Sequence, residues 1–137
     1  TIFVRLFTSS LSDRIGRRET MLIGASLLFV AMILLSRVDS YESFVLAAIV
    51  FGLATGVSSP TLFAWTADLS HIKRRGVGAG TLFIALEVGI MLGSYSTILT
   101  YDNTKASIEN VFLFGILMSF LAIVYLIWHK IYRTSDF

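Results

Sequence analysis

The 137-residue sequence contains no cysteine, a single proline and few charged residues. The lack of cysteine excludes a disulfide framework, thiol catalysis and thiolate metal sites. Only 15% of the residues are charged, against 55% that are hydrophobic, which is too little polar surface for a soluble domain. Lipid is therefore the expected solvent. The sequence also carries no metal, phosphate-binding or nucleophile motif, so we expect neither a cofactor nor enzymatic activity.

Four segments are apolar and long enough to cross a bilayer as helices: residues 20–36, 44–67, 76–100 and 111–128. Their lengths, from about 17 to about 25 residues, suit a helix that crosses roughly 30 Å of hydrocarbon. None has a sustained polar face, which argues against a soluble bundle. The apolar segment before Ser10 is expected to be the end of a fifth span, and the chain to be a piece of a longer protein. The predicted fold class is an all-α integral membrane bundle, with about four full spans plus the end of a fifth in one unit.

The basic residues predict how the chain crosses the membrane. Three arginines lie between residues 11 and 19 and three basic residues at 73–75, whereas the other two connections hold only Arg37 and Lys105. Under the positive-inside rule, the first and third connections and the C-terminus face the cytoplasm. We therefore expect a multi-pass protein of the inner or plasma membrane. The bases flank apolar spans and do not form one polar face, so nucleic acid is not an expected partner.

Glu87 is the acid that falls about midway along a predicted span. A charge there costs about 2.5–3.5 kcal/mol on insertion, so the side chain must face protein or water. A carboxyl group removed from water favours its neutral form, which makes Glu87 a candidate for proton coupling or substrate contact. A structural role stays open, in which Glu87 holds one helix to another by a permanent hydrogen bond.

The second predicted span is interrupted by Pro60, which leaves the Gly56 carbonyl without its helical hydrogen bond. Together with Ser58, Ser59 and Thr61, these residues form either the wall of a cavity or a packing kink whose hydroxyls bond back to their own helix. Glycines that we expect to permit close helix packing are Gly52, Gly76, Gly80, Gly89 and Gly93.

A helix-entry signal precedes this second span. In Asp39-Ser-Tyr-Glu42, Asp39 is expected to cap the helix and Glu42 to reach back to the cap.

The charged segment Leu11-Ser-Asp-Arg-Ile-Gly-Arg-Arg18 resembles a signature of the major facilitator superfamily. The family pattern is G-x-L-x-D-R-x-G-R-R on a cytoplasmic loop, and Ser9 stands where it has its first glycine. The resemblance implies a gate that holds the inner side closed and breaks when the two halves rock. In it, Asp13 accepts bonds from Arg17 or Arg18 and meets the positive end of a helix from the other half. The implied gate residues are Asp13, Arg14, Gly16, Arg17 and Arg18, and the alternative is that the arginines only set topology.

Two further stretches are similar to the same family. The pattern Gly52-x-x-x-Gly56-x-x-x-Pro60 resembles its tenth helix, and the cytoplasmic loop that follows contains Asp68, Arg74 and Arg75. Residues 80–89 resemble the eleventh helix of drug and sugar efflux members, with Glu87 where an acid is often found. The resemblance implies that the chain covers the end of helix eight through helix twelve, in the C-terminal half of a twelve-helix transporter. An N-terminal-half assignment is possible because the halves are related repeats, but the short tail favours the C-terminal one.

Together these features predict a secondary transporter that moves a small organic solute by alternating access. Its expected partners are the lipid bilayer, the N-terminal half of the same transporter, a small-molecule substrate and protons. We expect proton-coupled export. Two alternatives stay open: a uniporter or symporter of a sugar or metabolite, and, in a different class, a helical membrane subunit that transports nothing.

Overall fold

The computed structural model of the chain describes residues 14–102 and 105–134. In them, four long helices and one 3-10 turn follow one another, and no strand occurs: α2 (Arg17–Ser36), α3 (Tyr41–Leu69), η1 (Ile72–Arg74), α4 (Arg75–Thr100) and α5 (Lys105–Thr134). All four long helices are long and apolar enough to cross a membrane, and each contains one of the segments expected to span it. The predicted all-α class is confirmed. The expected end of a fifth span, before Ser10, lies outside the described residues.

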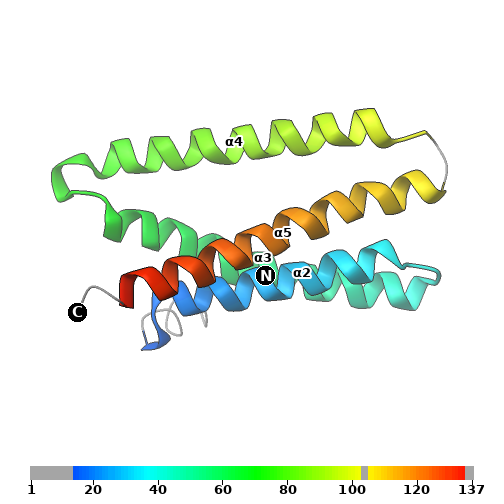
Figure 1. Cartoon of the computed structure of the whole chain (residues 1–137), viewed down its shortest axis with the longest axis horizontal. Helices are drawn as coiled ribbons and strands as arrows, with labels where there is room; N and C mark the ends of the chain where they lie inside the picture. Colours follow the sequence, from blue (N-terminus) through cyan, green and yellow to red (C-terminus); the bar gives the residue numbers. More distant parts are fainter. Residues whose placement is uncertain (1–13, 103–104, 135–137) are drawn as a thin grey trace.

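Successive helices run in opposite directions, so the bundle has two ends (Figure 1). One end holds the start of α2, the end of α3, the start of α4 and the end of α5. The other end holds the α2–α3 connection and the start of α5. Helix α2 packs against both α3 and α5, whereas α4 contacts α3, α5 and the adjoining η1 turn and lies apart from α2.

Small side chains form the buried interior of the bundle. Ala25, Ala31, Ala47 and Ala54 are buried, while large apolar side chains project outward along every helix. Without a hydrophobic force between helices in lipid, small residues let backbones approach and gain dispersion contacts. A soluble protein buries its large apolar residues, whereas this bundle buries small residues and exposes large apolar ones, as expected for helices surrounded by lipid.

Two local features fix where the first two helices begin. Gly16 precedes α2 with φ +106° and ψ 145°, a region that is open essentially to glycine alone. Ser40 caps α3: its hydroxyl accepts from the Ser43 amide at 3.3 Å, and the Ser43 hydroxyl accepts from the Ser40 amide at 3.1 Å. The expected cap at Asp39 is therefore wrong by one residue, because the pair of serines three apart closes the capping box in its place.

Helix α4 has no buried residue over its whole length. It meets α3 through Phe63 and Phe83, whose ring centroids lie 5.6 Å apart, and through the close approach of Gly78 to Ser70. Most of its surface is thus uncovered by the described part of the chain.

Candidate functional site

Arg17 and Asp68 join two segments of the chain that both carry the expected cytoplasmic charges. The Arg17 Nε donates to the Asp68 Oδ2 at 2.9 Å, across 51 positions of sequence. The pair links the first residue of α2 to the end of α3. Arg17 was expected to bind an acid of its own loop, Asp13, which lies outside the described residues. The structure gives Arg17 a partner near the end of α3, and its expected bond to Asp13 stays a prediction.

Both members of this pair sit at the helix end that their charge disfavours. Arg17 is at the N-terminus of α2, where the macrodipole is positive, and Asp68 is in the last turn of α3, where it is negative. Each charge offsets the unfavourable placement of the other. Because the side chains are 28% and 54% exposed, the pair contributes at most about 1 kcal/mol to stability. The arrangement therefore suits a contact that forms and breaks.

The backbone conformation of Gly16 explains why the charged motif has a glycine at this position. The Thr20 amide and hydroxyl both donate to the Gly16 carbonyl, at 3.1 and 2.9 Å. The positive φ of Gly16 lets the chain turn into α2, whose first residue, Arg17, binds Asp68.

The other charged residues of the two loops differ in their surroundings. Arg14, Arg74 and Arg75 are exposed. Arg18 is partly buried, and among the described residues no group accepts a hydrogen bond from its Nε or Nη2. The expected bond between Arg18 and Asp13 stays a prediction.

Glu87 lies near the middle of α4 and is exposed. In the described part of the chain its carboxylate has no hydrogen bond and no ion pair. A lone carboxylate in the middle of an apolar span requires water, a ligand or another protein segment beside it. The structure thus supplies no permanent partner for Glu87 from within these four helices.

The residues around Pro60 lie within α3, which continues through the proline. Thr61 is buried and donates to the Val57 carbonyl at 2.8 Å, which is the back-bonding expected of a packing kink. Gly56 is also buried. Ser58 and Ser59 are partly buried and form no side-chain hydrogen bond within the described ranges. The two interpretations of this region, cavity wall and packing kink, both keep support.

The glycines that make close helix contacts are different from those singled out in the sequence. A Cβ at Gly24 would collide with the Ser58 hydroxyl, and one at Gly115 would lie 2.9 Å from the Met32 sulfur. In the sequence, the small residues of Gly24-Ala-Ser26 could have indicated the close approach of Gly24 to Ser58. The expected packing glycines Gly52, Gly76, Gly80, Gly89 and Gly93 have nothing within 4 Å of such a Cβ in the described structure, so their role stays a prediction.

Comparison with known proteins decides the family. The sequence model of the Major Facilitator Superfamily matches residues 1–135. The chain belongs to this superfamily. The match covers all four described helices, with Arg17 at the start of α2 and Asp68 near the end of α3. No solved structure matches the chain.

Similar proteins of the Major Facilitator Superfamily include three named sugar transporters. The galactose-proton symporter of Escherichia coli (strain K12) is 28% identical over 96 residues, which is 70% of this chain and 20% of that protein. The arabinose-proton symporter of the same strain is 25% identical over 122 residues, 88% of this chain and 26% of that protein. The D-xylose transporter of Levilactobacillus brevis is 27% identical over 81 residues, 59% and 18% respectively. The chain thus spans between 18% and 26% of the length of these relatives.

Proposed function

We propose that the full protein containing this chain carries a sugar across the membrane together with protons, by alternating access. The names of two relatives, a galactose-proton and an arabinose-proton symporter, support this assignment. None of the three names supports the export by antiport that the sequence led us to expect. The alternative of a sugar symporter fits the relatives better.

Within the chain, the proposal rests on the position and surroundings of Glu87. It is the only acidic or basic residue near the middle of a described helix, and it has no partner in the described part of the chain. A carboxyl group in such a place can hold a proton or bind a sugar hydroxyl, since its protonated and charged forms offer different hydrogen bonds. In the proposed mechanism Glu87 takes up a proton on the side from which sugar binds and releases it on the side to which sugar is delivered.

The open surface of α4 is the proposed face toward the N-terminal half of the transporter. Family members place the substrate near the midplane between two halves. Glu87, Gly76 and Gly80, which share one side of α4, would then border that space, with the Gly56–Pro60 stretch of α3 beside it. This arrangement makes the chain most of the C-terminal half.

The Arg17–Asp68 pair is the proposed inner gate contact. We place its end of the bundle, and the C-terminus, in the cytoplasm because the arginines of both loops gather there. Its weak, exposed geometry suits a contact that opens once per transport cycle.

Proteoliposomes of the full protein test the proposal. With an inward proton gradient, we expect labelled galactose, arabinose or xylose to accumulate inside, and sugar addition without a gradient to carry protons in the same direction as sugar. Addition of a protonophore should abolish accumulation but leave exchange of sugar across the membrane. Sugar and proton movement in opposite directions would contradict symport, and sugar uptake with no proton movement would assign a uniporter.

A further inference from the structure

The α3–α4 segment, residues 69–77, exposes basic side chains without acidic neighbours. It contains no acid and lies at the end of the bundle that holds the start of α2 and the end of α5 (Figure 1). Lys73 and Arg74 are exposed, and neither forms an ion pair within the described residues. The acid closest to them in the sequence, Asp68, is already bound by Arg17. The segment therefore carries positive charge that the described bundle does not neutralise.

Three large apolar side chains of the same segment are also exposed. Leu69 is 66%, Ile72 78% and Val77 67% exposed. Exposed apolar side chains within a span face lipid tails, but Ile72 lies in the η1 turn between α3 and α4. Water would surround it there unless the turn lies in the interface between hydrocarbon and headgroups. In that interface apolar side chains lie against acyl chains, while basic side chains reach the phosphates.

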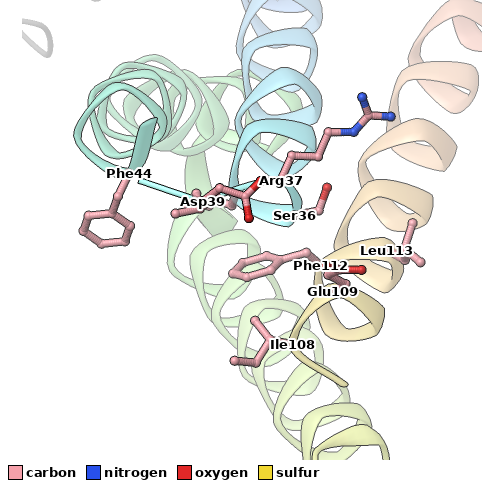
Figure 2. Close-up of a pocket in the computed structure, with 10 residues that line it drawn as sticks. Ser36, Arg37, Asp39, Phe44, Ile108, Glu109, Phe112 and Leu113 are labelled. Carbon is pink, nitrogen blue, oxygen red and sulfur yellow. The ribbon is translucent and has the colours of Figure 1, made fainter. Parts of the chain in front are cut away.

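The opposite end of the bundle differs in its charge. Arg37, Asp39 and Glu109 line one pocket there, between the end of α2 and the start of α5 (Figure 2). Charges of both signs thus share that end. Positive charge alone is a property of the α3–α4 segment and not of every connection in the bundle.

Membrane topology offers a plain explanation for the bases. Basic residues keep a connection in the cytoplasm, which accounts for Lys73 and Arg74 but not for the exposed Ile72 beside them. Topology also predicts no dependence on the lipid headgroup once the protein is inserted. An acidic protein segment would match the charges but leave the apolar side chains without a partner. A surface of anionic lipid matches both.

We propose that the α3–α4 segment binds anionic phospholipid of the cytoplasmic leaflet. Lys73 and Arg74 bind the phosphates, and Ile72 lies against the acyl chains. Because α4 begins in this segment, bound lipid holds the cytoplasmic end of the helix that carries Glu87. The choice of leaflet rests on the orientation proposed above, whereas lipid binding itself requires neither that orientation nor sugar transport.

Photo-crosslinking to lipids with two different headgroups tests this surface. The purified full protein is placed in mixed micelles with phosphatidylglycerol or phosphatidylcholine, each carrying the same photoreactive acyl chain, and the labelled peptides are identified by mass spectrometry. We expect phosphatidylglycerol to label residues 69–77 more than phosphatidylcholine does. Lys73→Gln combined with Arg74→Gln should lower that preference about fivefold for each charge removed. The matched control, Arg37→Gln combined with Lys105→Gln, removes two bases at the opposite end and should leave the preference unchanged.

The variant Ile72→Ser tests the apolar part of the surface. Labelling of residues 69–77 by both lipids should fall, because the side chain that lies against the acyl chains is lost, and unchanged labelling would contradict the proposal. Arg74→Gln alone, with an expected fall of about fivefold, replaces the double variant if that protein does not fold.

Three results of the headgroup comparison would overturn the proposal: equal labelling by the two lipids in the wild type, an unchanged preference in the Lys73 and Arg74 variant, or an equal loss in the control. A loss of thermal stability in that variant, with lipid labelling unchanged, would assign the two bases to a protein partner. Because the micelles impose no orientation and contain no sugar, these results do not depend on the proposed transport.

Discussion

The Arg17 guanidinium binds the Asp68 carboxylate at 2.9 Å, and so ties the start of α2 to the end of α3. Arg17 begins α2 and Asp68 lies in the last turn of α3, and each adjoins a connection that is rich in basic residues. Arg17, one residue of the charged motif, thus contacts a residue 51 positions away in the sequence. It also leaves both charges at helix ends that disfavour them when the contact is broken.

A double-mutant cycle on this pair measures the contact directly. We expect Arg17→Gln and Asp68→Asn each to lower stability, with a coupling of about 0.2–1 kcal/mol because both side chains are partly exposed. Thermal unfolding of the full protein in detergent at low salt gives the three differences. Strictly additive effects would show that the pair contributes nothing, and would remove the physical basis for the proposed gate.

Replacement of Gly16 tests the backbone role of the motif. We expect Gly16→Ala to destabilise the protein by about 1–3 kcal/mol, since φ +106° is strained for any residue with a Cβ. Ser26→Ala, on an exposed position of the same helix, is the control and should be neutral. A Gly16→Ala protein with an unchanged unfolding midpoint would refute the positive φ at this residue.

The close packing of α2 against α3 at Gly24 and Ser58 can be disrupted by one substitution and restored by a second. Gly24→Ala places a Cβ against the Ser58 hydroxyl, and we expect overpacking of about 1–3 kcal/mol. Adding Ser58→Ala removes the obstructing oxygen and should restore most of the loss. Thermal unfolding of both variants checks this. A double variant no more stable than Gly24→Ala would show that the helices do not meet there.

The sequence predicts the helices well because the need for long apolar spans is local and strong. All four expected segments fall inside observed helices. It predicts contacts less well. Asp68, a partner of Arg17, is 51 residues away, and neither sequence segment alone reveals the contact. Gly24 and Gly115 make close contacts because of where α2 crosses its neighbours, which depends on packing and not on spacing along one helix. The sequence analysis did not identify the cap at Ser40, because Ser40 and Ser43 form the capping box of α3 in place of Asp39 and Glu42.

Substitution of Pro60 distinguishes the two interpretations of its region, a cavity wall and a packing kink. We expect Pro60→Ala to keep or raise stability, by up to about 3 kcal/mol, because it restores a helical hydrogen bond to Gly56. If the region borders the substrate, the same variant should lower the sugar transport rate in proteoliposomes several-fold. Leu53→Ala, at an exposed position of the same helix, is the control. A stable Pro60→Ala protein with full transport would assign the proline to packing.

We propose that Glu87 couples sugar movement to proton movement. The most direct measurement is sugar-evoked proton flux into proteoliposomes of the full protein, followed with an internal pH dye, for the wild type, Glu87→Gln and the control Glu42→Gln. We predict that proton movement is lost in Glu87→Gln and kept in the control, while exchange of labelled sugar across the membrane survives in all three. Proton flux that persists unchanged in a folded Glu87→Gln protein would contradict the account.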